Sequence, residues 1–153
     1  MAAPQYEGIG FLVKAGKQRL FDAKSLMSSG KHERERGAAY ICGYSVECLL
    51  KAVLISRAPG GPNTLTRAAD AYRQNNPSFP SLATARAHDI GFLIALCEVD
   101  AKVVFDENLR KRLGTAMKWK HTWRYLPDRP KGRFASDLIS AAESVVQSLE
   151  QLC

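Results

Sequence analysis

The feature that most constrains this chain is an apolar stretch of eighteen residues at positions 38–55, which reads AAYICGYSVECLLKAVLI. Within it, only Gly43, Ser45, Glu47 and Lys51 are neither apolar nor aromatic. Apolar residues therefore fall on every side of a helix formed by this stretch. The sequence predicts a central helix that is buried on most sides and around which the rest of the chain is organised.

One polar and aromatic stripe interrupts this central helix. Tyr40, Tyr44, Glu47 and Lys51 are spaced i, i+4, i+7 and i+11, which places all four on a single face. Glu47 precedes Lys51 by four residues, the favourable order for an acid and a base on a helix. We expect this core polar stripe to face a polar partner, to line a site, or to be a structural pair that also serves a dimer interface.

The central stretch is near the minimum length for a membrane span, but its two charged residues argue against one. Glu47 and Lys51 would each cost about 2.5–3.5 kcal/mol near the centre of a bilayer. The N-terminal sequence MAAPQYEG has no basic region followed by an apolar run, so it does not look like a signal peptide. We expect a soluble, cytoplasmic protein with no membrane partner.

The chain length and composition suit one globular domain. With 153 residues, 46% hydrophobic and 24% charged, residues 1–153 are expected to share one core. The cysteines, Cys42, Cys48, Cys97 and Cys153, form no CxxC pair, and the first two lie inside the apolar stretch. We interpret Cys42 and Cys48 as small buried apolar side chains, and expect no disulfide, metal or cofactor.

The net charge of +7 comes from one segment, residues 110–133. This segment has nine basic residues and one acid, Asp128, whereas the rest of the chain has thirteen basic and fourteen acidic residues. Such a basic segment attracts phosphate groups, so we expect contact with a nucleic acid or a nucleotide; a solvated surface without a partner is the alternative. The expected binding residues are Arg110, Lys111, Arg112, Lys118, Lys120, Arg124, Tyr125, Arg129, Lys131 and Arg133.

Helical periodicity predicts the remaining elements. Besides the central helix, which begins in the charged run 31–36 and ends at Arg57, we expect helices at about 6–28, 63–74, 89–118 and 134–152. Segments rich in Pro and Gly separate them, and no stretch alternates with the period of a strand. The predicted fold class is all-α, an up-down bundle of four main helices plus short ones.

Three pieces of the chain resemble the HEPN domain family, in that family's order. Residues 43–52, GYSVECLLKA, resemble its central-helix signature. Residues 88–90, together with Leu93, are similar to the start of a family helix that has the pattern His-x-hydrophobic. Residues 123–125, together with Pro127, are similar to the turn containing Arg and Tyr that precedes the last helix of the family. The resemblance covers nearly the whole chain, although only the central-helix piece is specific.

This resemblance implies a helical bundle that is often a homodimer. Many HEPN members are RNA-cutting toxins, or partners of minimal nucleotidyltransferases in toxin–antitoxin and defence systems. In the catalytic members, an Arg followed after four to six residues by a His carries metal-independent RNA cleavage, and two copies meet at the dimer interface. A homodimer, an RNA or nucleotide ligand and a nucleotidyltransferase partner are therefore expected.

The chain departs from the family's catalytic pattern. None of His32, His88 and His121 follows an Arg at the required spacing. The arrangement that comes nearest to the motif is Arg112 with His121, which are separated by eight residues. The related motif, with a Tyr two residues after the His, is also absent. The leading prediction is a HEPN-type module that binds a nucleic acid or nucleotide without turnover. Alternatives are a divergent metal-independent ribonuclease and a partner subunit of a nucleotidyltransferase.

A ribonuclease would need residues in the basic segment to carry the chemistry. His121 and Arg124 are three residues apart and share a face if the turn is helical, so they are the candidate catalytic residues. With Lys118, Lys120 and Tyr125, they would supply an acid or base, phosphate clamps and a stacking ring.

A purely structural interpretation of the same residues is also open. Trp119, Trp123 and Tyr125 would pack the turn, and Arg124 would pair with Glu47, because a buried carboxylate needs a partner. His88 would then be a structural residue at the start of its helix.

Overall fold

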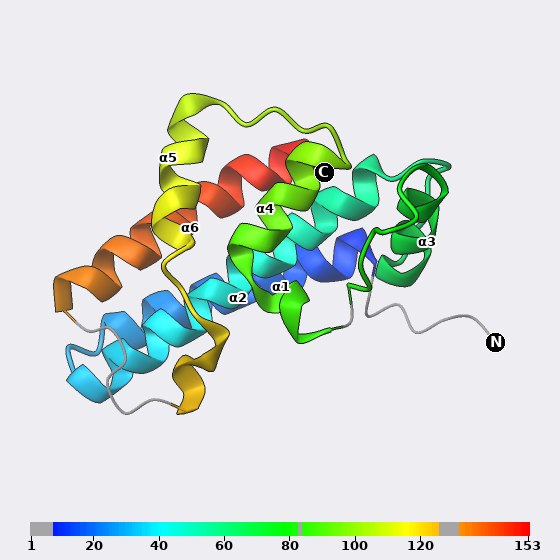
Figure 1. The fold of residues 1–153 in the computed structure, drawn as a ribbon. Coiled ribbons are helices and arrows are strands. Elements are labelled where there is room, and N and C mark those ends of the chain that lie inside the picture. The colour runs from blue at the N-terminus through cyan, green and yellow to red at the C-terminus, as the bar shows by residue number, and fades with distance from the viewer. Residues whose placement is uncertain (1–7, 83, 126–131) are drawn as a thin grey trace.

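Helix α2, His32–Arg57, runs through the middle of the computed structural model, and α1, α4 and α6 all pack against it (Figure 1). The described residues are 8–82, 84–125 and 132–153; for His32, Glu33, Ala85, Arg124, Tyr125 and Gly132 only the backbone is described. Over these residues no strand forms. With η marking a 3₁₀ helix, the elements besides α2 are α1 Ile9–Met27, α3 Leu65–Asn75, η2 Ala85–His88, α4 Ile90–Val99, α5 Glu107–Ala116, η3 His121–Tyr125 and α6 Gly132–Leu152. The prediction of an all-α helical bundle is confirmed.

The predicted apolar stretch forms the larger part of α2 and is buried as expected. Val46, Leu49, Leu50, Val53 and Leu54 are all completely shielded from solvent. Each buried side chain of this size stabilises the fold by about 1.5–3 kcal/mol relative to an exposed one. Helix α2 is therefore the main source of core surface for the helices around it.

Helix α1 lies unusually close to α2 at Gly16. A Cβ atom at this position would lie 2.3 Å from Cδ2 of Leu49 and 3.0 Å from the carbonyl oxygen of Ser45. Only a residue without a side chain allows this approach, so Gly16 determines where α1 crosses α2.

Two of the predicted helices begin at a side-chain cap. The Thr64 side chain accepts a hydrogen bond from the Arg67 amide at 3.2 Å, and the Asp89 side chain accepts one from the Phe92 amide at 2.9 Å. These bonds satisfy backbone N–H groups that have no partner within the helix. Helices α3 and α4 therefore begin where the sequence signals predicted.

The expected continuous helix at 89–118 is wrong. Helix α4 ends at Val99, residues 101–106 are not helical, and α5 begins at Glu107. Lys102 has a φ of 57°, in the left-handed region that interrupts a right-handed helix, and the side chain of Asp106 caps α5 by accepting from the Leu109 amide at 2.8 Å. The break turns α5 away from α4, so that α5 packs against α6 (Figure 1).

Among the described residues, one helical segment, Arg34–Arg57, is long and apolar enough to cross a membrane by length and composition. The core helix of a soluble protein passes the same test, and 78% of the apolar window is buried inside the fold. The test therefore does not by itself indicate a span. The cytoplasmic location and the lack of a membrane partner remain predictions.

All four cysteines are free, and burial differs among them. Cys42 is fully buried, as predicted, whereas Cys48, which lies beside Gly16 of α1, is half-buried rather than buried. Burial raises the pKa of the Cys42 and Cys97 thiols to about 12 and that of Cys48 to about 11. Cys153 is exposed as a residue, but partial burial of its thiol against the end of α6, together with the charge of Glu150, raises its pKa to about 11.

We expect these thiols to react slowly in the folded protein. At pH 8, a thiol with a pKa near 12 is ionised in about one molecule in 10⁴, and only the thiolate is a nucleophile. A colorimetric thiol reagent should modify Cys153 first, because it is the exposed cysteine, and all four only after denaturation. Rapid modification of Cys42 or Cys97, with native circular dichroism retained, would contradict the burial described above.

Candidate functional site

The core polar stripe lies on one face of α2, as its spacing predicted. The hydroxyl oxygens of Tyr40 and Tyr44 are 2.8 Å apart, and the two rings meet edge to face. One helical turn further on, Nζ of Lys51 donates to Oε1 of Glu47 at 2.7 Å. Glu47 is 5% exposed and Lys51 8% exposed, so this is a buried ion pair within one chain.

The Glu47 carboxylate also holds a residue from outside α2. Nδ1 of His88, at the end of η2, lies 2.9 Å from Oε1 of Glu47, the same oxygen that accepts from Lys51. Among the described residues, Oε2 of Glu47 has no hydrogen-bond partner. The side chain of Arg124, expected to pair with Glu47, lies outside the described residues, so the partners seen for this carboxylate are Lys51 and His88.

His88 brings a second imidazole into the site. The ring centroids of His88 and His121 are 5.7 Å apart, with the ring planes tilted by 43°. The His88 side chain is 42% exposed, and His121, the first residue of η3, is half-buried. We call these two residues the histidine pair. The sequence contained no signal for it, because they lie on separate elements and neither belongs to a recognisable catalytic motif.

The contact with Glu47 defines which nitrogen of His88 faces the core. A carboxylate oxygen accepts hydrogen bonds, so Nδ1 of His88 carries the proton in this contact. Nε2 is then left as the nitrogen that can take up or release a proton. Glu47 thus supports His88 from the core, and 42% of the His88 side chain is exposed.

Trp119 fixes the segment that carries His121. Its ring lies against Gly43, where a Cβ atom would come within 2.0 Å of the ring, and its Nε1 donates to the Tyr40 carbonyl at 2.9 Å. Trp119 is 3% exposed and Trp123 9% exposed, so these two side chains pack the turn as expected. Gly43 therefore has a packing role: it leaves room for Trp119.

Three of the expected binding residues gather in one groove between α5 and α6. Lys111, Arg112 and Lys118 line it, together with Phe134 and Asp137, and the groove has a volume of about 470 Å³. An Arg112 guanidinium nitrogen donates to the Ser144 hydroxyl at 2.8 Å, and Nζ of Lys118 lies 5.9 Å from the centroid of the Phe134 ring. We call this hollow the α5–α6 groove.

The other expected binding residues do not line this groove. Arg110 pairs with Glu98 on α4 at 2.8 Å, and Lys120 is exposed beside His121. Arg133 is highly exposed, with Nε 3.9 Å from a carboxylate oxygen of Asp137. The side chains of Arg124 and Tyr125, and all of Arg129 and Lys131, lie outside the described residues.

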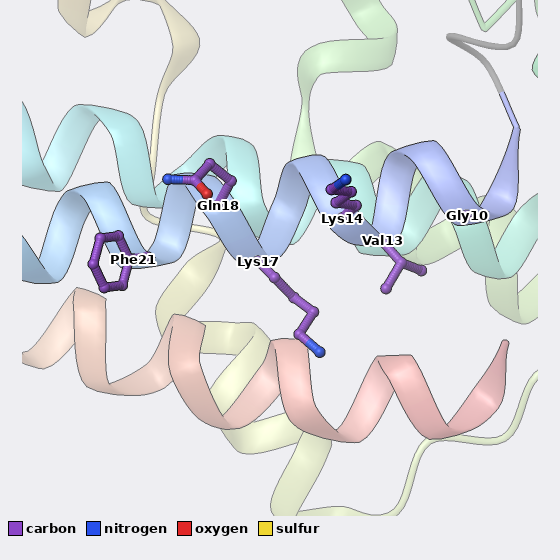
Figure 2. Close-up of a pocket in the computed structure, with 6 residues that line it drawn as sticks. All are labelled: Gly10, Val13, Lys14, Lys17, Gln18 and Phe21. Atoms are coloured by element: carbon purple, nitrogen blue, oxygen red, sulfur yellow. The ribbon is translucent and has the colours of Figure 1, made fainter.

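A second hollow follows α1 and was not expected from the sequence. Figure 2 shows its six lining residues, and its volume is about 530 Å³. The Lys17 side chain extends from α1 toward α6, where Nζ lies 3.0 Å from Oε1 of Glu150. Phe21, at one end of the hollow, is 66% exposed. Among the described residues, its lining consists of two lysines, one glutamine and three residues without a polar side chain.

No family model, no curated protein and no solved structure matches this chain. The resemblance to HEPN domains therefore rests on the motifs quoted above.

Proposed function

We propose that this chain is a HEPN-type helical module that binds nucleic acid, in the form of single-stranded RNA, through the α5–α6 groove. The observation that carries the proposal is the grouping of Lys111, Arg112 and Lys118 around one hollow that also contains the Phe134 ring. Cations contact the phosphates of a strand, and an aromatic ring stacks on its bases. The groove thus combines the two chemistries by which proteins bind single strands.

The charges in the groove support this proposal because they are available to a ligand. Among the described residues, Lys111 and Lys118 form no ion pair, and the hydrogen bond of Arg112 goes to a neutral hydroxyl. Asp137 is the one acid among the lining residues, against three cations. A strand entering the groove would therefore meet a net positive charge.

The resemblance to HEPN domains supplies the biological role and the protein partners in the proposal. It implies a role in a toxin–antitoxin or defence system, with a homodimer or a nucleotidyltransferase as the protein partner. Three residues of the family-like segment 43–52 have structural roles: Gly43 leaves room for Trp119, and Glu47 forms an ion pair with Lys51.

Binding should be sensitive to salt. If three cations contact phosphates, the affinity for a single strand should fall about 20-fold between 50 and 200 mM salt, and each removed contact should lower the logarithmic salt slope by about 0.7. The measurement is fluorescence anisotropy with a labelled single-stranded oligoribonucleotide, for the wild type, Lys111→Ala and Lys118→Ala.

The neighbouring residue Arg110 supplies a matched control. Arg110→Ala removes the same charge as Lys111→Ala and from the same helix, but Arg110 is paired with Glu98 and does not line the groove. We expect it to leave the salt slope close to that of the wild type. The proposal fails if the wild type does not bind RNA at 50 mM salt, or if all three substitutions weaken binding equally.

A further inference from the structure

The histidine pair brings two imidazoles from separate elements close together. His88 is the last residue of η2 and His121 is the first residue of η3. The His88 side chain is 42% exposed and His121 is half-buried, so an ion can reach the pair from solvent. Neutral imidazole is the commonest metal ligand among side chains. The pair is therefore a candidate metal site, which the sequence did not predict because the two residues are far apart in the chain.

The separation of the two rings is close to the one that a shared ion requires. An imidazole nitrogen binds Zn²⁺ at about 2.0–2.1 Å, and two imidazoles on a tetrahedral ion then have ring centroids about 5–5.5 Å apart. The centroids of His88 and His121 are 5.7 Å apart, and the 43° between the ring planes shows that the rings are not stacked face to face. Small rotations of the two side chains would bring one nitrogen of each ring onto a common ion.

Glu47 gives His88 the support that metal-bound histidines usually have. Nδ1 of His88 donates to Oε1 of Glu47 at 2.9 Å, so Nε2 is the nitrogen left for a metal. Histidines that bind metals almost always donate their other ring N–H to a carboxylate, a carbonyl or water, which fixes the ring and makes the ligand more basic. Glu47 is 5% exposed and is itself held by Lys51 at 2.7 Å. Glu47 is therefore a positioning residue, because it acts on the ion only through His88.

His121 has its ring nitrogens available as ligands. Among the described residues, they form no hydrogen bond and no ion pair, and the contact of this ring is with His88. The backbone on its N-terminal side is anchored, because Nε1 of Trp119 donates to the Tyr40 carbonyl at 2.9 Å. His121 thus combines a fixed position with a side chain that the fold does not otherwise use.

The charges around the pair tolerate a cation. Glu47 and Lys51 offset each other inside the core, and Lys120, next to His121 in the sequence, is exposed, so water screens its charge. Within the described part of the chain, no group of three or more histidine, cysteine, aspartate or glutamate side chains could hold a metal. The remaining coordination positions are therefore left to water or to an incoming ligand, and we expect weaker binding than at a closed site with four protein ligands.

We infer that the histidine pair binds a divalent transition-metal ion, with Zn²⁺ the best match, through Nε2 of His88 and one ring nitrogen of His121. Imidazole suits Zn²⁺, Cu²⁺ and Ni²⁺, whereas Mg²⁺ and Ca²⁺ prefer oxygen ligands. The ion ties η2, which precedes α4, to η3, which precedes α6. The inference does not rest on the proposed function, because neither histidine lines the α5–α6 groove.

The test is isothermal titration calorimetry of the full chain, without an affinity tag, using ZnCl₂ in a buffer that does not bind metals. We expect one ion per chain for the wild type, and no binding of Mg²⁺. His88→Ala and His121→Ala should each lower the affinity for Zn²⁺ by at least about tenfold. Two controls should bind like the wild type: His32→Ala, which removes the third histidine of the chain, and Cys153→Ser, which removes the exposed thiol.

A second measurement needs no variant in the binding site. In ¹⁵N spectra of the imidazole nitrogens of the wild type, Zn²⁺ should shift the resonances of His88 and His121 and leave those of His32 in place. Absence of Zn²⁺ binding by the wild type, an affinity that is unchanged in both alanine variants, or a shift of His32 alone overturns the inference. Each of these results leaves the RNA-binding proposal intact, because that proposal is tested with a different ligand and different residues.

Glu47 has a separate readout as a positioning residue. Glu47→Gln should lower the affinity for Zn²⁺ about 10-fold to 100-fold, because the amide fills the same space but does not support the imidazole as a carboxylate does. Lys51→Met is the matched control: it disturbs the same buried ion pair but leaves the contact of Glu47 with His88, so it should keep the affinity of the wild type. Equal losses in the two variants would show that Glu47 acts only through the stability of the fold.

Discussion

Lys51→Met is expected to lower the free energy of unfolding by about 3 kcal/mol, measured by urea or guanidinium denaturation. The substitution keeps the apolar part of the side chain but leaves Glu47, 5% exposed, without its ammonium partner at 2.7 Å. Removing one partner of a buried ion pair typically costs 3–5 kcal/mol. We expect the lower end of that range, because His88 still contacts the same carboxylate oxygen.

Two further variants test whether burial is the cause. Lys17→Met removes the partner of Glu150 in an ion pair whose side chains are 55% and 39% exposed, and should cost less than about 1 kcal/mol. The double variant Glu47→Leu with Lys51→Met removes both buried charges, and should recover most of the lost stability. A single Lys51→Met variant as stable as Lys17→Met would contradict the burial of the pair.

Gly43→Ala is expected to destabilise the protein by about 1–3 kcal/mol, although alanine is the better helix former. The added Cβ atom would lie 2.0–2.2 Å from three atoms of the Trp119 ring. That ring is 3% exposed and its Nε1 is bonded to the Tyr40 carbonyl, so it cannot move aside freely. Displacing Trp119 would also shift the segment that carries Lys118 and His121.

Gly114→Ala is the matched control for this prediction. Gly114 lies within α5, and a Cβ atom there would have nothing within 4 Å. Helix propensity alone then applies, so this variant should gain up to about 1 kcal/mol. Thermal denaturation of the two variants should therefore shift the midpoint in opposite directions, and equal shifts would show that Trp119 does not lie against Gly43.

Much of the fold could be predicted from the sequence because helices are local structures. The spacing of apolar residues identified α2, and α3 and α4 begin close to residues 63 and 89, where helices were expected. The contact of Glu47 with Lys51 follows from a separation of four residues, which the geometry of any helix brings together. Each of these features depends on residues within one or two turns of the chain.

The break between α4 and α5 could not be predicted in this way. Residues 101–106 sit between two segments with helical periodicity, and the apolar side chains of Val103 and Phe105 suited a continuous helix. In the fold, these two side chains are buried from a non-helical segment instead. Tertiary packing outweighed a local preference that is worth less than 1 kcal/mol per residue.

Some features of the fold and of the candidate site follow from local sequence, and others depend on tertiary packing. The sequence by itself determined the all-α fold, the buried central helix and the stripe from Tyr40 to Lys51, because each follows from helical spacing. Only the tertiary structure decided that His88 meets His121 and Glu47, that Trp119 lies against Gly43, and that three of the basic residues share one groove. These contacts join elements far apart in the chain, and their geometry depends on how whole helices pack rather than on any spacing in the sequence.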